Sequence, residues 1–543
     1  MKRDYVLIVK ILLNEEGIMN KNLFKSQESV SVSVMATDTV NVAGGKAYAL
    51  SDHAALAQYA MTGCFNGTYY CQEKDQLTKV LALANRCDPK FVAKVACYSR
   101  EKGLMKDMPA FLAAVVASKD TALLSSIFAR VIDSPKMLRN FVQITRSGVT
   151  GRKSFGTRPK RLIQQYLENL SDIELFNADV GNDPSLQDII KMVRPKPSNV
   201  NRNALHAYLL DKEYNAGDLS PVVRAYEDFK KDPSGEMPKV PFQKLDSLPL
   251  TDAHWAQIAE NASWTQTRMN LNTFLRHNVF GDGRLVELLA LRLENADLIK
   301  SSKVFPYQLF SAFKNVDSKI PQRITVALQR AAEIAIQNIP EFAGNVYVLE
   351  DISGSMRNPV TGNRAGASSK VSCLDVAALF AASVLRKNPE AKVIPFSDNV
   401  VPTELSPLDS IMTNATKLAS LPSGGTNCSA PLTYLNMKNA KGDLVIYVSD
   451  NESWMDSNKA ASYYNRSSGT QTMDEWKKYK QRNPKAKLVC IDITPGGTSQ
   501  TQPDKDILNI GGFSDNVFEV ISKFVESGNE ADFWVKTIEA VKL

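Results

Sequence analysis

The chain has 543 residues, of which 44% are hydrophobic and 23% charged, and its formal net charge is +7. That length exceeds what one hydrophobic core usually supports, so we expect at least two domains of an ordinary soluble protein. No run of about 18 apolar residues occurs, which excludes a membrane-spanning helix. Seven thinly spread cysteines without a C-x-x-C pair make a zinc site unexpected and indicate reduced thiols, as in the cytoplasm.

The chain begins with "MKRDYVLIVKILL", in which basic residues precede an apolar stretch, as in a signal peptide. Lys10 interrupts that stretch, and "NEEGIMNKN" follows where a small-residue cleavage site would stand. We therefore interpret residues 1–40 as an extension that is not exported. Translation starting at Met19 is an equal alternative.

The segment that follows is expected to consist of stacked helices. Helices are predicted to start at Asp75, Asp88, Asp107 and Asp120, since aspartate caps the exposed N–H groups of a first turn. Asp75 to Asp107 and Asp88 to Asp120 are both separated by 32 residues, the length of a helix-pair repeat. Such pairs bury their apolar faces by stacking into a solenoid or ring, and helical patterns continue to about residue 335.

Two basic stretches in this part are candidate phosphate contacts. "TRSGVTGRKSFGTRPKRLIQQYL" (residues 145–167) is a glycine-rich loop that leads into a helix near Pro159, and "KMVRPKPSNVNR" follows at 191–202. Cations and backbone N–H groups at a helix N-terminus can bind phosphate together, although a solvated loop is an open alternative. The candidate RNA-binding residues are Arg146, Arg152, Lys153, Arg158, Lys160, Arg161, Lys191, Arg194, Lys196 and Arg202.

The charge distribution also distinguishes the two parts of the chain. From Gly344 to the end there are 21 Lys and Arg against 22 Asp and Glu, a net charge of −1. The remaining 44 basic and 36 acidic residues give the preceding part a net charge of +8. The whole positive excess therefore lies in the first part of the chain. A solvated basic surface would explain this excess by itself, and a surface for a polyanion such as RNA is the sharper alternative, which the two basic stretches in the same part favour.

From about residue 345, apolar runs typical of strands alternate with helical runs. The strands are predicted in "NVYVLE", "AKVIPFS", "DLVIYVS" and "KLVCIDI", and the first helix in "CLDVAALFAASVLRK". This alternation predicts a parallel sheet with helices on both faces, whose ligands lie at the carboxyl ends of the strands.

Three polar clusters fall at those strand ends. "DISGS" supplies Asp351, Ser353 and Ser355, "SGGTNCS" supplies Thr426, and "YVSDNES" supplies Asp450. Two carboxylates and three hydroxyls are hard oxygen donors, which suit Mg²⁺ or another divalent cation. The sequence therefore predicts a metal site at this edge of the sheet.

The same cluster is not expected to be catalytic. An aspartyl nucleophile usually has a second acid two residues later for leaving-group protonation, and that position is Ser353. A serine nucleophile needs a nearby histidine base, yet all four histidines precede residue 278. We therefore expect binding rather than turnover, with no catalytic residues, and a partner carboxylate as the next metal ligand.

The three clusters, in this order on this fold, resemble the metal-ion-dependent adhesion site of von Willebrand factor A domains, matching it at Asp351, Ser353, Ser355, Thr426 and Asp450. Together with "NGTYY" at 66–70, the helical repeats, "GRKSFGTRPKR" and "KVFPYQLFSAF" at 303–313, they resemble the Ro ribonucleoprotein family, especially its bacterial members. The likeness spans roughly residues 45–543. "SLQDIIKMV" departs from it by lacking the histidine that animal members carry there.

The resemblance implies a multidomain fold: an all-α ring of HEAT-like helical repeats, the TROVE module, at 41–343 and a doubly wound, Rossmann-like α/β A domain at 344–543. It implies binding of Y-type small noncoding RNAs on the outer basic surface and of single-stranded 3′ ends of misfolded RNAs in the central hole. It also implies RNA quality control or decay with the 3′ exoribonuclease polynucleotide phosphorylase. A metal-dependent protein scaffold without an RNA role is the alternative, and an RNA-processing enzyme ranks third.

Overall fold

The computed structural model describes residues 33–543 except for a set of short gaps. The gaps are 64, 67, 69–70, 182–183, 246, 303, 305, 338, 364–370, 455–467, 515 and 528–529. The start of the predicted extension, with Met19, and parts of "NGTYY" and "KVFPYQLFSAF" thus lie outside the described residues. None of the described helices is long and apolar enough to cross a membrane.

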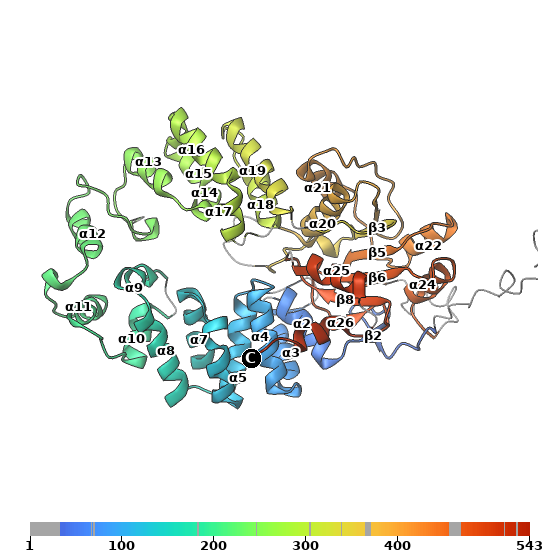
Figure 1. Cartoon of the computed structure of the whole chain (residues 1–543), viewed down its shortest axis with the longest axis horizontal. Coiled ribbons are helices and arrows are strands. Elements are labelled where there is room, and N and C mark those ends of the chain that lie inside the picture. Colours follow the sequence, from blue (N-terminus) through green and yellow to red (C-terminus); the bar gives the residue numbers. More distant parts are fainter. Residues whose placement is uncertain are drawn as a thin grey trace, which may run out of the picture.

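The helical part forms two arms that run out from the A domain and back to it (Figure 1). The first arm contains α2 (Asp52–Thr62), α3 (Glu73–Arg86), α4 (Pro89–Glu101), α5 (Asp107–Lys119), α6 (Thr121–Val131), α7 (Pro135–Ser147), α8 (Thr157–Asn169), α9 (Asp172–Ala178), α10 (Leu186–Val193) and α11 (Val200–Leu209). The far end of the ring contains η2 (Ala216–Asp218), α12 (Pro221–Lys231) and η3 (Phe242–Lys244).

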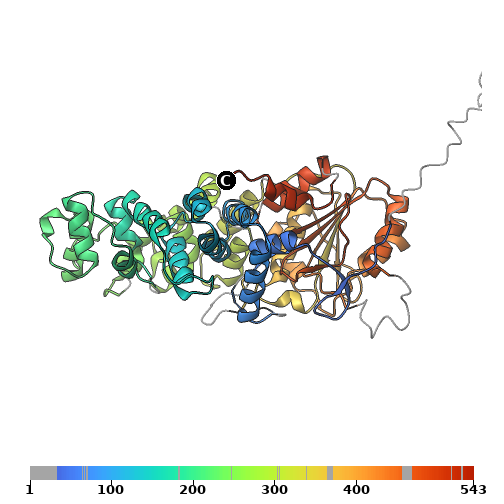
Figure 2. The ribbon, with the colours of Figure 1, turned by 90° about the horizontal axis from the view of Figure 1, so that it is seen from below.

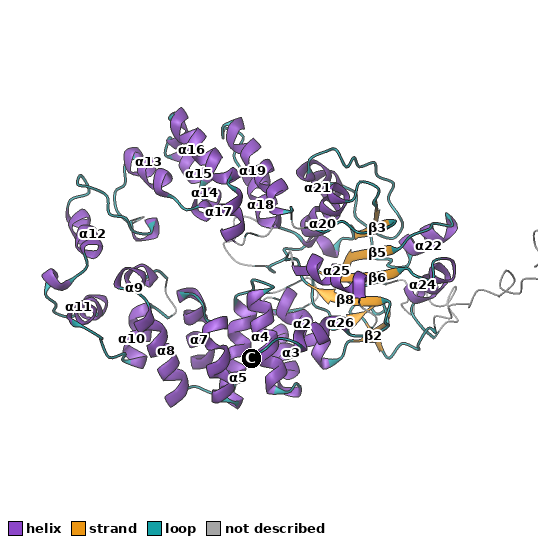
Figure 3. Cartoon of the chain, viewed as in Figure 1, coloured by secondary structure: helices purple, strands orange, loops and turns teal. Residues whose placement is uncertain are grey.

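The second arm returns to the A domain. It contains α13 (Asp252–Asn261), α14 (Trp264–Met269), α15 (Leu271–Arg276), η4 (Val279–Gly281), α16 (Gly283–Glu294), α17 (Ala296–Ser302), α18 (Pro306–Asn315) and α19 (Gln322–Ala335). The predicted helical ring is therefore confirmed, and strands are confined to the region of the A domain in Figure 3.

Helices begin close to all four predicted starts, but the predicted capping holds only in part. α5 begins at Asp107 as expected, with Lys106 and not Asp107 at the N-cap position. Asp120 accepts hydrogen bonds from the N–H groups of Ala122 and Leu123 at 2.8 and 3.0 Å, which confirms it as the N-cap of α6. Asp88 occupies the N-cap position of α4, but its side chain makes no capping hydrogen bond. The predicted start at Asp75 is wrong, because α3 already begins at Glu73 and Asp75 lies within its first turn. There its charge still interacts favourably with the helix dipole.

The A domain contains a five-stranded parallel sheet in the order β4-β3-β5-β6-β8. Its strands are β3 (Val346–Asp351), β4 (Lys392–Phe396), β5 (Leu444–Ser449), β6 (Lys487–Asp492) and β8 (Ile507–Gly511). The turn after β3 contains η5 (Ser355–Arg357), and the helices are α20 (Cys373–Lys387), α21 (Ile411–Ala419), α22 (Ala430–Met437), α24 (Gln471–Arg482), α25 (Asn516–Ser527) and α26 (Phe533–Glu539).

Helices cover both faces of this sheet, so its central strands are buried throughout, as expected for a parallel sheet. Figure 2 shows the strands between two layers of helices. Side chains from α20 and α25 pack on one face, and side chains from α22 and α24 pack on the other. The first layer belongs to the same hydrophobic cluster as both helical arms, so the core continues across the joint between the arms and the sheet.

The N-terminal segment joins the A domain rather than the helices. β2 (Lys46–Ala49) pairs antiparallel with β1 (Thr39–Val40) on one side and with β7 (Thr498–Ser499) of the A domain on the other. At the other end of the chain, α26 packs against α2 and α4 of the first arm. Segments from both ends of the described chain therefore close the ring at the A domain.

Candidate metal centre and nucleic-acid interface

The structure brings all five predicted metal-site residues to the carboxyl edge of the sheet. Asp351 ends β3, and Asp450 follows β5, the strand that pairs with β3. Ser353 and Ser355 lie in the turn after β3 with their hydroxyl oxygens 3.1 Å apart, and Thr426 precedes α22. All five side chains are buried. The adjacent parallel strands explain the meeting of the two acids, because strand ends of equal register share one edge.

Hydrogen bonds fix the orientation of Asp351. One carboxylate oxygen accepts the backbone N–H of Ser353 at 2.8 Å, and the other accepts the hydroxyl of Ser449 at 2.5 Å. Burial and the nearby charge of Asp450 raise the pKa of Asp351 to about 7, although these hydrogen bonds act in the opposite direction. The fold thus holds two acids close together in a buried environment. Ionising both of them there costs free energy, which a bound cation would offset.

Backbone contacts lock the three loops together. The N–H of Gly354 donates to the carbonyl of Gly424 at 3.0 Å, and the N–H of Trp454 donates to the carbonyl of Thr426 at 3.0 Å. Asp398 accepts the N–H of Gly425 at 2.7 Å and the indole N–H of Trp454 at 3.1 Å. The hydroxyls and carboxylates are therefore positioned before any ligand arrives.

The chemistry of this donor set fits a small hard cation. Two carboxylates and three hydroxyls can supply oxygen ligands to Mg²⁺, with water completing the shell. No group of three or more His, Cys, Asp and Glu able to hold a metal occurs within the described part of the chain. A cation at this site would therefore need the hydroxyls of Ser353, Ser355 and Thr426 in addition to the two carboxylates.

Two further buried acids stand beside the cluster and were not predicted. Asp492 ends β6 and accepts a hydrogen bond from the amide of Gln58 on α2. Glu452 is 2% exposed and accepts the N–H of Val42 at 2.8 Å. Burial, followed by the charge of Asp450, raises the pKa of Asp492 well above its usual value and that of Glu452 to about 7.

A sequence signal existed for only one of them. Asp492 ends an apolar strand, as Asp351 does, and the same strand-end rule would have found it. Glu452 depends on Val42, which is 410 residues away, so no local pattern marks it. One carboxylate oxygen of each acid has no hydrogen-bond partner among the described residues.

The two basic stretches, separate in sequence, meet on one face of the first arm. A pocket of about 610 Å³ lies at the start of α8 and is lined by Arg146, Ser154, Phe155, Gly156, Thr157, Lys160, Arg161, Gln164 and Met192. The side-chain amide of Gln164 on α8 donates to the carbonyl of Val193 at 2.7 Å, which ties α8 to the end of α10. We call the surface around this pocket the basic face.

Three of the ten predicted cations, Arg146, Lys160 and Arg161, line this pocket, and most of the ten are exposed. Exposed side chains include Arg146, Lys153, Arg158, Arg161, Lys191, Arg194 and Lys196, and Lys160 is half-buried. Arg146 donates to the carbonyl of Lys153 at 3.1 Å, which orders the loop. No side chain caps the first turn of α8, whose N-cap is Gly156, so the helix N-terminus is open to an anion.

Two arginines from the predicted set have structural contacts instead. Arg202 is wrong as a surface contact: it is buried on α11, with its guanidinium 3.0 Å from the carboxylate of Asp172. Its guanidinium also donates to the carbonyls of Leu167 and Leu170 and so ties α11 to α8. Arg152 is half-buried and donates to the carbonyl of Ala117 on α5 at 2.5 Å.

Parts of the chain and its whole length are similar to known proteins. Residues 346–525 match the model described as the Ro60 vWA domain. The chain is similar to "RNA-binding protein RO60" of Deinococcus radiodurans, with 23% identity covering 89% of this chain and 94% of the relative. It is also 23% identical to the protein of that name from Caenorhabditis elegans, over 56% of this chain and 48% of the relative.

The fold has a counterpart among solved structures. The crystal structure of the Deinococcus radiodurans RO (RSR) protein superposes with a TM-score of 0.60 at 18% identity. The alignment covers 88% of this chain and all of the other. The likeness therefore extends over both arms and the A domain.

Proposed function

We propose that this chain, whose predicted resemblance to the Ro ribonucleoprotein family is confirmed by those matches, is an RNA-binding protein. The observation that carries the proposal is the basic face, where Arg146, Lys160 and Arg161 of the first basic stretch line one pocket at the start of α8 and Met192 of the second stretch adjoins them. Two relatives named as RNA-binding proteins support it.

The basic face has the chemistry of a phosphate-binding surface. Arg146, Lys160 and Arg161 line the pocket, and Arg158 lies exposed in the first turn of α8. No ion pair to any of these four cations occurs among the described residues, so their charges are available to an external anion. Each cation that contacts a phosphate releases condensed counterions, which makes such binding strong at low salt.

The finer proposal concerns which RNA is bound and where. We assign Y-type small noncoding RNA to the basic face, because structured RNA presents rows of phosphates that match a clustered cationic surface. Single-stranded 3′ ends of misfolded RNA are assigned to the interior of the ring. The role is RNA quality control or decay in the cytoplasm, together with polynucleotide phosphorylase.

We further propose that the A domain holds Mg²⁺ or a similar divalent cation at Asp351, Ser353, Ser355, Thr426 and Asp450. Support comes from the two buried carboxylates of Asp351 and Asp450 and the three buried hydroxyls, which the fold gathers at one edge of the sheet. A bound ion would supply positive charge that favours the ionised carboxylates. The chain's own residues hold the loops in place, and water or a partner carboxylate would supply the remaining ligands.

The protein is proposed to bind rather than to catalyse. All four histidines lie before residue 278, on the helical part, so none precedes or follows the A-domain serines closely in sequence. A serine nucleophile without a base is weak. The hydroxyls of the cluster are accordingly assigned to ligand binding.

Purification from cells tests the function. The protein is expected to carry bound RNA, which raises the 260/280 absorbance ratio above the value expected for the protein alone. Treatment with ribonuclease should lower the ratio to that value. A matched preparation of the Arg158→Ala, Lys160→Ala, Arg161→Ala variant should carry less. A nucleic-acid-free wild type that also fails to bind added structured RNA at low salt contradicts the proposal.

A further inference from the structure

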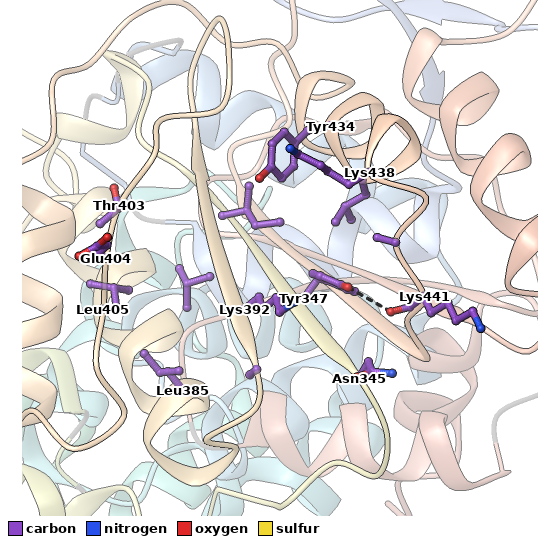
Figure 4. A pocket seen from close by; sticks show the side chains of 15 residues that line it. Asn345, Tyr347, Leu385, Lys392, Thr403, Glu404, Leu405, Tyr434, Lys438 and Lys441 are labelled. Carbon is purple, nitrogen blue, oxygen red and sulfur yellow. Dashed lines mark hydrogen bonds between the residues drawn. The ribbon is translucent and has the colours of Figure 1, made fainter.

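A second cleft lies on the A domain at the opposite end of the sheet from the metal cluster. Its volume is about 900 Å³, and Asn345, Lys392 and Lys441 place it near the amino ends of β3, β4 and β5. In Figure 4, Thr403, Glu404 and Leu405 stand on one side, and Tyr434 and Lys438 on the other. The edge strand β4 runs between these two walls.

The outer edge of β4 is partly unpaired. The carbonyl of Phe396 accepts the N–H of Ile352, so the backbone groups of Phe396 point toward β3. Alternate residues of a strand point their N–H and C=O groups to opposite sides, so those of Pro395 and Val393 point outward. The carbonyl of Pro395 is taken by the N–H of Val401 at 2.8 Å. The N–H and C=O of Val393 have no backbone partner in the described part of the chain.

The chain protects only one end of this edge. Pro395 has no N–H to offer, and the turn at Ser397–Val401 folds back over the end of β4. Proline and short covering turns are the usual means of blocking an edge strand. Lys392 and Val393 lie beyond this protection and line the cleft. An extended segment has room to bind at that end through backbone hydrogen bonds.

The charge around the open edge favours an acidic ligand. Lys392, Lys438 and Lys441 are exposed and line the cleft, and no ion pair to any of them occurs within the described residues. Lys438 lies over the ring of Tyr434, with its ammonium nitrogen 5.8 Å from the ring centroid. Glu404 is the acid in the lining. Three cations against one anion leave a positive cleft.

Apolar side chains complete the walls. Leu385 comes from α20 on one face of the sheet, Leu435 from α22 on the other, and Leu405 from the segment opposite β4. Alternate side chains of an added strand point to opposite faces, so one set would lie on the side of α20 and the other on the side of α22. Tyr434, 39% exposed, is the aromatic residue at the rim.

We propose that this cleft binds an extended acidic peptide segment of a partner protein, which adds to β4 as an edge strand. Backbone bonds to Val393 give register, the three lysines select glutamate or aspartate, and the aliphatic walls accept small apolar side chains. A nucleic acid fits less well, because it cannot use the outward N–H and C=O as a strand does and finds one rim aromatic for stacking. This binding is independent of the RNA role.

Fluorescence anisotropy with the full-length protein tests the proposal. The probe is a labelled, end-blocked peptide of alternating glutamate and valine, compared with its lysine-valine counterpart and with a labelled oligouridylate. The acidic peptide is expected to bind the wild type, and the basic one is not. The Lys392→Glu, Lys438→Glu, Lys441→Glu variant should lose at least about tenfold in affinity. A control variant changes Lys477, Lys485 and Lys505 to Glu and should bind as the wild type does.

A second variant tests the strand geometry. Val393→Pro removes the outward N–H without breaking the β3–β4 ladder and should weaken the acidic peptide by about fivefold. Circular dichroism establishes that each variant is folded, and hydrogen exchange at the Val393 amide should slow when peptide is added to the wild type. The proposal is overturned if the acidic peptide does not bind, if the lysine variant binds it unchanged, or if that variant loses oligouridylate instead.

Discussion

Asp351 is the side chain at which the proposed Mg²⁺ binding is most directly tested. It is buried beside Asp450, and without a cation the two charges repel each other. Asp351→Asn keeps the shape of the side chain and removes one charge. In EDTA the variant should therefore be at least as stable as the wild type. With Mg²⁺ at about 100 times its dissociation constant, the wild type should gain about 2.7 kcal/mol and the variant nothing.

Thermal unfolding with Mg²⁺ and with EDTA measures both effects. Asp398→Asn is the control, because Asp398 supports the loops through Gly425 and Trp454 and is not among the five proposed ligands. That variant should be less stable yet still respond to Mg²⁺. If neither Mg²⁺ nor EDTA changes the melting temperature of the wild type, the proposed Mg²⁺ site is wrong.

Elements distant in sequence meet at the loop after β5, which carries Asp450 of the candidate metal site. The turn between β1 and β2 contacts it, since Asn41 donates to the carbonyl of Ser453 at 2.8 Å and Glu452 accepts the N–H of Val42. A β-carbon on Gly45 would lie 2.3 Å from the carbonyl oxygen of Ser453. The turn and the loop therefore pack too closely to admit one more carbon.

Gly45→Ala should accordingly push the N-terminal turn from the loop that carries Asp450. We expect a loss of about 2 kcal/mol in the free energy of unfolding and a weaker response to Mg²⁺, both measurable by chemical and thermal denaturation. Gly283→Ala, in the first turn of α16 with no atom within 4 Å of the new carbon, is the matched control and should be nearly neutral. Equal effects of the two substitutions would show that the turn does not brace the loop.

The sequence predicted elements well where local signals suffice. "CLDVAALFAASVLRK" is α20 from its first residue to its last, because Ser372 and Asp375 form a capping box at its start. β1, β2, β7 and β8 were not predicted. β1 and β2 are short, and β2 is stabilised by β7, some 450 residues later in the chain. β8 is a brief run with Asn509 in its middle.

Site residues, too, could be predicted where local sequence signals suffice and not where distant partners decide. The five metal-site positions were predicted because each stands at a strand end or in a glycine turn, and the fold brings such ends together. Arg202 was misassigned because its partner, Asp172, lies 30 residues before it and removes it from the surface. The joining of the two basic stretches depends on Gln164 and the packing of α8 against α10, which no local pattern contains.

At the scale of the whole molecule, the ring is a scaffold that holds separate binding surfaces apart. The A domain is fixed to the second arm by Lys314 and Asp375, 2.7 Å apart, and to the first arm by Asn516 and the hydroxyl of Tyr98, 2.6 Å apart. The basic face lies along the first arm at α8 and α10 (Figure 1). Changes to the metal cluster should consequently leave RNA binding by the basic face intact.

The salt dependence of RNA binding is the most direct test of whether the basic face binds RNA. A structured small RNA is titrated at several salt concentrations against wild type, against the Arg158→Ala, Lys160→Ala, Arg161→Ala variant, and against a control in which exposed Lys74, Lys90 and Lys319 become alanine. Loss of three phosphate contacts should weaken binding by about 2–3 kcal/mol and flatten the log–log salt slope by about 2, while the control matches wild type. Unchanged affinity and slope in the first variant would contradict the assignment of RNA to the basic face.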